Sequence, residues 1–227
     1  MAGLGGFPAA TRKFLDGIAA NNNKEWFEAH RDLYDDGFVA AGRAFVEALG
    51  PELRKVSPGV QFEPKINGSI GRPYRDTRFS RDKRPYKDHL DLLFWHGDKK
   101  GWERPGFFIR LSSEAVWMGS GMHHIEGELL DRFRTAIVDD GSGKALAATI
   151  AKVERAGDYV VGMQNRKQVP RGYEKDHPRA NLLLFESLTA MCRLTIEDAL
   201  APNFGTEALR NFRATWPIGK WIMDHTI

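Results

Sequence analysis

The order of hydrophobic patterns along the chain most strongly constrains its fold. Apolar residues recur at three- and four-residue spacing up to residue 57, alternate in short runs between residues 58 and 122, and return to helical spacing from residue 123. Helices at both ends with strands gathered between them differ from the regular alternation of strand and helix in parallel sheets. We therefore predict an α+β fold with a small, mostly antiparallel sheet flanked by N-terminal and C-terminal helices.

The length of the chain, 227 residues, is sufficient for one large core, and no repeat of domain size is visible. We predict a single domain over residues 1–227, with a helical part at 1–57, a strand-rich part at 58–122 and a second helical part at 123–227. The single cysteine, Cys192, excludes an internal disulfide, and its apolar neighbours predict that it packs in the core.

No run of apolar residues approaches the roughly 18 that a membrane span needs. The first residues have neither the basic nor the apolar region of a secretory signal. We therefore expect a cytoplasmic protein without a membrane partner.

In the first half of the chain, Pro8 predicts the start of a helix that ends at residue 20. Asn23 predicts the cap of a long amphipathic helix that continues to residue 56 and that Gly50-Pro51 could kink or split. An edge strand or hairpin is expected over residues 60–70.

In the second half, residues 107–111 and 115–118 predict an antiparallel strand pair. Four C-terminal helices are predicted, at 124–138, at 143–156, at 178–191 and from a Thr206 cap to about residue 223, the last with a kink at Pro217.

Residues 72–88 carry the excess positive charge of the chain. This segment holds seven Lys or Arg and three Asp, a net charge of +4. The whole chain has 33 basic and 30 acidic side chains, so the other 210 residues hold 26 and 27 and are net −1. Cations at this density, with Pro to fix the backbone and aromatic rings to support it, predict a site for an anion.

Two similar stretches lie twelve residues apart in this segment, at 72–76 and 84–88. Each places cations on both sides of a Pro-Tyr pair, and the two elbows could face each other across residues 77–83. Arginine offers planar donors to phosphate or carboxylate, and hydroxyl groups can complete the shell. The predicted ligand-binding residues are Arg75, Arg78, Ser80, Lys83, Tyr86 and Lys87.

Residues 75–87 read R-D-T-R-F-S-R-D-K-R-P-Y-K, which resembles the R-D-T-R-F-S-x-D-K-x-P-Y-K signature of the domain of unknown function 2461 family. The segments 14–15, 22–27 and 119–122 are similar to that family too. The resemblance covers most of the chain and implies a single α+β domain, but it brings no established activity, catalytic residue or cofactor. The first elbow, residues 72–74, lies outside the signature.

The leading hypothesis is an anion-binding domain for a phosphorylated or carboxylated ligand. If the protein is an enzyme, Asp76 is the first candidate for the acid or base, because the neighbouring cations keep it ionised. One alternative is a nucleic-acid-binding module in which aromatic residues such as Trp95, Trp102 and Trp117 stack on bases. Another is a structural or interaction domain in which Asp76, Asp82 and Asp88 form an internal ion-pair network with the cations.

No metal site is predicted. His123 and His124, near Glu126 and Glu128, are adjacent histidines whose side chains point apart, and they favour a helix start over metal binding. The phosphate-binding, dinucleotide-binding and nucleophile-elbow motifs of common enzyme folds are missing from the sequence.

Overall fold

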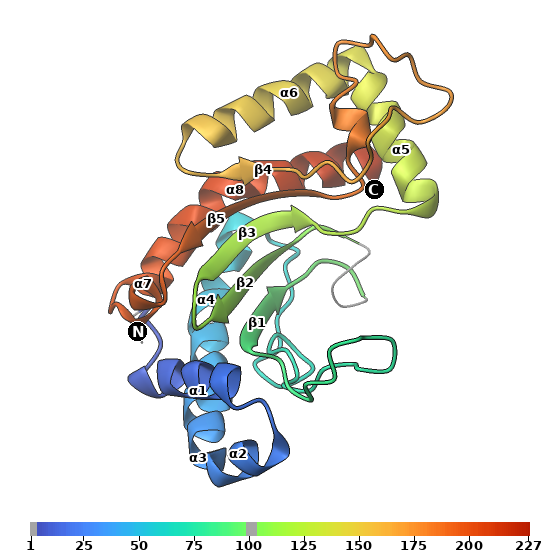
Figure 1. Ribbon diagram of the computed structural model, residues 1–227. Helices are drawn as coiled ribbons and strands as arrows, with labels where there is room; N and C mark the ends of the chain where they lie inside the picture. The colour runs from blue at the N-terminus through green and yellow to red at the C-terminus, as the bar shows by residue number, and fades with distance from the viewer. Residues whose placement is uncertain (1–3, 99–103) are drawn as a thin grey trace. The chain divides into compact units, whose positions relative to one another are not determined.

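The computed structural model describes residues 4–98 and 104–227. Within these residues five strands form one sheet in the order β1-β2-β3-β5-β4 (Figure 1). The strands are β1 (His89–Phe94), β2 (Gly106–Ser112), β3 (Val116–Met122), β4 (Val160–Val161) and β5 (Leu188–Leu194). β4 pairs with β5 in antiparallel fashion, with Val160 opposite Met191. The predicted α+β class is confirmed.

Helices precede β1, lie between β3 and β5, and follow β5. The N-terminal helices are α1 (Ala9–Ala20), α2 (Lys24–Ala29), α3 (Arg31–Tyr34), the π-helical η1 (Asp35–Ala40) and α4 (Ala41–Val56). The later helices are α5 (Gly127–Val138), α6 (Asp140–Arg155), the 3-10 turn η2 (Leu182–Leu184), α7 (Ile196–Leu200) and α8 (Phe204–Thr226).

The contacts divide the chain into two compact units. Unit 1 comprises the residues up to 94 together with 108–118 and 193–210, and unit 2 comprises 95–107, 119–192 and 211–227. The chain passes between the units several times, so neither is a continuous segment. A single domain over residues 1–227 stays a prediction.

Aromatic rings form the centre of unit 1. The Phe14 ring lies 5.6 Å from that of Tyr34, 5.7 Å from Phe38 and 6.2 Å from Phe27, measured between centroids. Phe14, Phe27 and Phe38 are almost completely buried. Since edge-to-face and tilted rings at these distances attract one another beyond simple burial, this cluster holds the short N-terminal helices together.

The start of α2 agrees with the sequence, because the side chain of Asn23 accepts a hydrogen bond of 2.9 Å from the Trp26 amide. The prediction of one helix from residue 24 to 56 is wrong. The helix is interrupted at His30, and residues 35–40 form the π-helix η1. There Gly37 lies against the backbone of α1. The hydroxyl of Thr11 donates to the Gly37 carbonyl at 2.6 Å. α4 then continues through Pro51, so Gly50-Pro51 does not split it.

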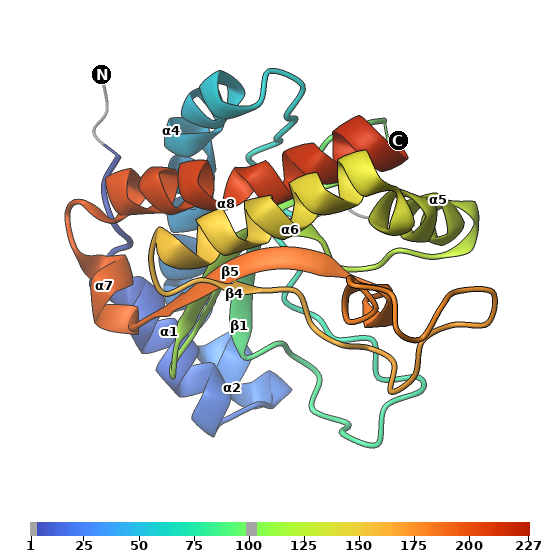
Figure 2. The same cartoon turned by 90° about the horizontal axis from the view of Figure 1, so that it is seen from above.

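Unit 2 contains its own apolar cluster, which includes Phe133, Leu146, Leu183 and Trp221. Asp139 joins α5 to α6, and the two helices can be followed in Figure 2. The buried guanidinium of Arg179 donates to the carbonyls of Ile137 at 2.7 Å and Val138 at 2.9 Å. These carbonyls would otherwise lack partners at the end of α5, so Arg179 fixes the corner.

Three other expectations from the sequence are wrong. Residues 178–191 form the short turn η2 and most of β5 instead of a helix. Residues 60–70 contain isolated bridges, including Ile66–Ile70 and Ile70–Leu92, instead of a continuous edge strand or hairpin. The last helix begins at Phe204, so Thr206 lies inside it and is not its cap.

The error at β5 has a physical cause. Most side chains of β5 are buried, so the strand lacks the polar alternation that distinguishes a half-exposed strand from a buried helix.

Two glycines in β3 allow the backbone of β5 to approach closely. A Cβ on Gly119 would lie 2.0 Å from the Ala190 carbonyl oxygen, and one on Gly121 would lie 2.3 Å from that of Leu188.

No helix in the two described ranges is long and apolar enough to cross a membrane. Cys192 is buried in β5, and burial raises the pKa of its thiol to about 11, so the reactive thiolate is disfavoured. Trp102 lies outside the described residues.

We predict that Gly119→Ala destabilises the protein by about 1–3 kcal/mol, because the added methyl group overlaps backbone that cannot move away easily. The free energy of unfolding from urea denaturation measures this. The matched control is Gly42→Ala in α4, where the nearest atom to the new Cβ is the Ile70 Cδ1 at 3.4 Å. The control should be neutral or stabilising by up to about 1 kcal/mol. Equal stability of Gly119→Ala and the native protein would contradict the close packing of β3 on β5.

Candidate functional site

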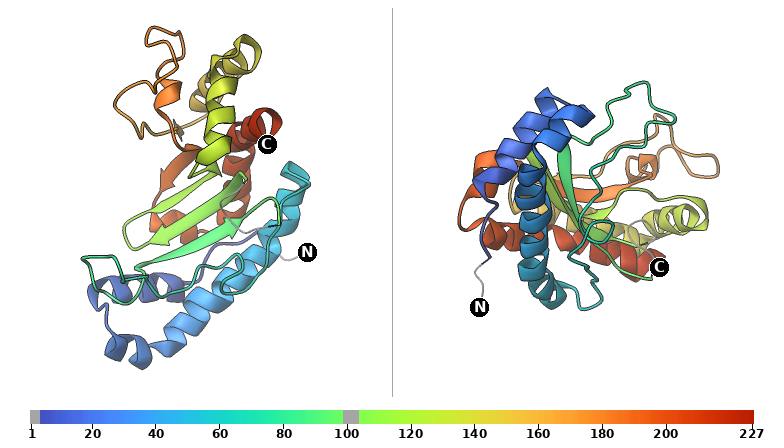
Figure 3. Two further views of the ribbon diagram at one scale, coloured as in Figure 1. Left: turned by 90° about the vertical axis from the view of Figure 1, so that its right-hand side faces the viewer. Right: turned by 90° about the horizontal axis from the view of Figure 1, so that it is seen from below.

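The two elbows of the basic segment face each other. Tyr74 and Tyr86 form an antiparallel bridge. The Arg75 amide donates to the Pro85 carbonyl at 2.9 Å, and the Lys87 amide donates to the Pro73 carbonyl at 2.7 Å. The pairing predicted from the near-repeat is therefore confirmed, and it closes the base of a loop whose outer part, residues 77–83, we call the tip loop (Figure 3).

The base of this loop is anchored to the N-terminal helices through Tyr86. The Asn22 side chain donates to the Tyr86 carbonyl and accepts from the Tyr86 amide, both at 3.0 Å. The Tyr86 ring also stacks on Phe27, with centroids 4.3 Å apart and an interplanar angle of 6°. Asn22 thus replaces a neighbouring strand, and Tyr86, which is buried, belongs to the core of unit 1.

All three acidic residues of the segment are ion-paired. Arg78 binds Asp76 with two parallel hydrogen bonds, from Nε at 3.0 Å and from Nη2 at 2.7 Å. These bonds lower the pKa of Asp76 to about 2. Asp82 accepts from both Arg84 and Arg75, which lowers its pKa below the usual range. Both carboxylates are therefore held ionised by arginine at the surface of the loop.

A fourth carboxylate, Asp91 in β1, is more deeply placed. Its oxygens lie 2.7 Å from Nε of Arg110 on β2, 3.0 Å from Nζ of Lys87 and 3.3 Å from Nε2 of His89. Burial raises the pKa of Asp91, but the hydrogen bonds and charges of His89 and Arg110 outweigh this and keep the pKa below 3.8. Asp91 therefore stays ionised although its side chain is only 15% exposed.

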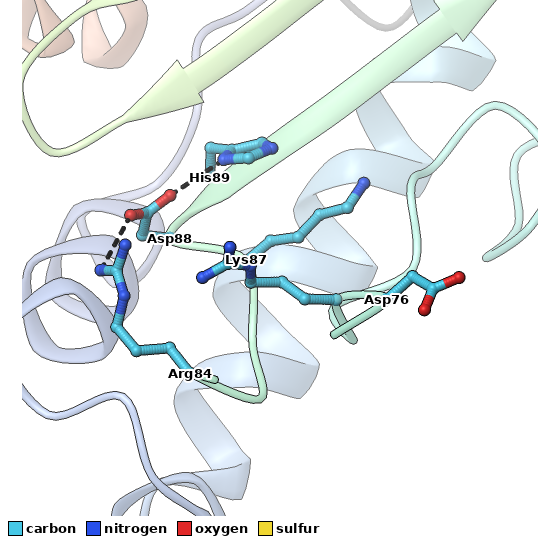
Figure 4. Close-up of a pocket in the computed structure, with 6 residues that line it drawn as sticks. Asp76, Arg84, Lys87, Asp88 and His89 are labelled. Carbon is cyan, nitrogen blue, oxygen red and sulfur yellow. Dashed lines mark hydrogen bonds and ion pairs between the residues drawn. The ribbon is translucent and has the colours of Figure 1, made fainter. Parts of the chain in front are cut away.

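A pocket of about 340 Å³ opens beside these ion pairs, and we call it the Lys87 pocket. Its lining residues are Arg75, Asp76, Arg84, Lys87, Asp88 and His89. In Figure 4 Asp88 lies between Arg84 and His89, at 3.3 Å and 3.0 Å, whereas the carboxylate of Asp76 points away from them.

The cations of the Lys87 pocket differ in how many donors they have left. Arg84 uses Nε and Nη2 on Asp82 and Nη1 on Asp88. Arg75 uses only Nη1, on Asp82, and Lys87 makes one bond, to Asp91. Among the described residues, Nε and Nη2 of Arg75 and two protons of Lys87 therefore have no acceptor, and these are the donors that an anion could take.

The predicted ligand-binding residues divide into two groups. Arg75 and Lys87 line the pocket. Arg78, Ser80 and Lys83 lie on the tip loop, where Lys83 donates to the Thr77 carbonyl at 2.9 Å, and Tyr86 is packed in the core. Arg84, His89 and Asp91 were not predicted as site residues from the sequence, and Asp88 was considered only as a member of an internal ion-pair network.

A signal for two of these was present in the sequence. His89, Asp91 and Leu93 alternate with the buried Leu90, Leu92 and Phe94, so they share one face of β1. β1 begins where the basic segment ends, so a histidine and an aspartate on one face of this strand could have indicated the site. The contact of Asp91 with Arg110 depends on the pairing of β1 with β2, and no local sequence pattern predicts it.

The model of a family described as "Conserved hypothetical protein (DUF2461)" matches residues 10–221. The chain belongs to the DUF2461 family. The matched residues include Asn22, the tip loop and the Lys87 pocket, and the match confirms the family expected from the sequence. No curated protein matches the chain.

The histidines considered as metal ligands do not gather other ligands. His124 lies 2.9 Å from Glu126, and both side chains are largely exposed. Within the part of the chain that the structure describes, no group of three or more His, Cys, Asp or Glu is placed to hold a metal ion.

We predict that Asn22→Ala destabilises the DUF2461 protein by about 1–3 kcal/mol, because the Tyr86 amide and carbonyl lose their partners in a largely buried place. Thermal and urea denaturation measure the effect. Asn21→Ala, which removes one exposed bond of 3.2 Å to the Gly17 carbonyl, is the control and should cost less. If the two variants are equally stable, Asn22 is not the anchor.

The low pKa of Asp91 predicts a pH dependence of stability. Its ionised form is favoured in the folded state, so its stabilisation is fully present above about pH 4 and is lost as the pH falls toward the folded pKa. Asp91→Asn should therefore lower the free energy of unfolding by about 1–3 kcal/mol at pH 7. The difference from the native protein should shrink below pH 4. A difference that stays constant from pH 7 to pH 3 would show that the charge of Asp91 is not the cause.

Proposed function

We propose that the Lys87 pocket is an anion-binding site for a small phosphorylated or carboxylated ligand. The observation that carries the proposal is the pair of cations with unused donors. Arg75 and Lys87 are only 25% and 27% exposed, and both line the same pocket. Charge-assisted hydrogen bonds from such partly buried cations are stronger than those from solvated side chains.

The neighbouring carboxylates support this role by positioning the cations. Asp82 fixes one end of the Arg75 guanidinium, and Asp91 fixes the ammonium of Lys87. A side chain already held in place loses less conformational entropy when the ligand binds. Arg84, whose donors are used on Asp82 and Asp88, adds positive charge to the pocket but fewer free hydrogen bonds.

The remaining lining residues restrict the ligand class. Asp88 can accept hydrogen bonds from ligand hydroxyl or amino groups, and the His89 ring has a polar edge beside it. A volume of about 340 Å³ is near the small end of ligand pockets. A compact anion that also carries hydroxyl groups, such as a sugar phosphate, suits this combination better than a bulky or purely anionic ligand.

A catalytic role for Asp76 has less support than binding. Its carboxylate points away from Asp88 and His89, and a pKa of about 2 makes it a weak base. An internal ion-pair network as the main purpose of the motif also has less support. The pairs of Asp76 and Asp82 are exposed to solvent, and such pairs stabilise proteins little.

We infer a cytoplasmic location together with this function. The only cysteine is a buried free thiol, so the fold contains no internal disulfide that would need an oxidising compartment to form. The cytoplasm would supply phosphorylated metabolites as ligands for the pocket.

The test is calorimetric titration, at low salt, with nucleotides, sugar phosphates and dicarboxylates. We expect a ligand whose affinity falls about 10–100-fold in Arg75→Ala and in Lys87→Ala, since each variant loses a charge-assisted bond. Arg81→Ala is the matched control, because it removes the same charge from an exposed residue that does not line the pocket. Its affinity should stay within about twofold of the native value.

Two results would overturn the proposal. One is that no compound of the panel binds to the native protein. The other is that Arg81→Ala weakens binding as much as Arg75→Ala, which would indicate attraction by net charge instead of a site.

A further inference from the structure

The seven cations of the basic segment fall into two groups. Four of them have carboxylate partners: Arg75, Arg78, Arg84 and Lys87. The other three, Arg72, Arg81 and Lys83, are exposed and have no carboxylate partner among the described residues. The first group shares four carboxylates, the three acids of the segment and Asp91, which also binds Arg110. The second group shares none among the described residues, and its three charges lie outside the Lys87 pocket.

The tip loop that carries Arg81 and Lys83 also carries the most exposed aromatic ring of the described chain. Phe79 is 94% exposed. The guanidinium carbon of Arg78 lies 5.8 Å from the centroid of the Phe79 ring. At the base of the same loop Tyr74 is 50% exposed. Phe79 therefore contributes little to the stability of the fold, whereas the Tyr74 ring also lies 5.3 Å from the Tyr86 ring. Exposed rings beside cations without carboxylate partners suit a partner that is both aromatic and anionic.

We propose that the tip loop binds single-stranded nucleic acid. A base stacks on the ring of Phe79, the exposed part of Tyr74 offers a second stacking surface, and Arg72, Arg81 and Lys83 contact phosphates. Stacking on aromatic rings tolerates any base, so this contact would be largely independent of sequence. The antiparallel bridge of Tyr74 with Tyr86 and the bonds of Asn22 hold the base of the loop, so that part of the platform exists before binding.

Single-stranded nucleic acid fits the tip loop better than an anionic membrane. The neighbours of Phe79 are Arg78 and Ser80, so one apolar side chain is the whole apolar surface of the tip. An interfacial membrane anchor needs a larger apolar face beside its cations. A duplex fits less well too, because its bases are stacked on one another and are not available to Phe79.

This site is separate from the proposed anion pocket. Phe79, Arg81 and Lys83 do not line the Lys87 pocket, and Arg75 and Lys87 are not among the residues assigned to the tip-loop site. Each proposal can therefore fail without the other.

The test is fluorescence anisotropy with labelled 15-nucleotide oligo-dT and oligo-U at 50 mM salt. We expect both to bind, Phe79→Ala to weaken binding about 5–100-fold, and Phe79→Trp to retain it. Arg81→Ala should lower the slope of log affinity against log salt by about 0.7. Met163→Ala, which alters another exposed apolar side chain, should leave the affinity within about threefold of the native value.

Several results would overturn the inference. These are no binding of either oligonucleotide, equal affinity of Phe79→Ala and the native protein, and equal or tighter binding of a duplex of the same length. Phe79-dependent retention on phosphatidylserine vesicles without oligonucleotide binding would assign the tip loop to a membrane surface instead.

Discussion

The site depends on the two hydrogen bonds between the Asn22 side chain and the Tyr86 backbone. A side-chain amide offers a donor and an acceptor side by side, so it can satisfy an exposed strand segment where no second strand is present. The stacking of Tyr86 on Phe27 adds an apolar contact to this polar one. Lys87 follows Tyr86 directly, so an asparagine between α1 and α2 helps to position the loop side of the site, whereas His89 and Asp91 are placed by β1.

Around this anchor, acidic residues position basic ones. Asp91 is shielded from solvent and binds cations from the loop end and from β2, so its charge contributes to folding as well as to the site. Asp76 and Asp82 are exposed, so their value lies more in fixing the directions of arginine side chains than in stability. The charge excess first visible in the sequence is thus divided between a paired, half-buried part beside the Lys87 pocket and an unpaired, exposed part on the tip loop.

Local signals in the sequence were sufficient for much of the fold. Pro8, Asn23 and the alternation near residue 109 placed elements correctly, because caps and periodicity act within a few residues. β5 was misread because a strand buried on both faces has no alternation. The π-helical turn at Gly37 depends on contact with α1. In the site, the near-repeat predicted the pairing of Tyr74 with Tyr86, whereas the contact of Asp91 with Arg110 comes from strand pairing, which local patterns do not contain.

The anchor joins residues 64 positions apart in the chain. Closing a segment of this length costs entropy before any contact compensates for it, whereas helices α1 to α4 form from neighbours in sequence. We expect the basic loop to become ordered late in folding, after the aromatic cluster around Phe14 has fixed the turn that carries Asn22. Loss of the anchor would then act chiefly on the rate of unfolding, since contacts made after the transition state determine how long the native state lasts.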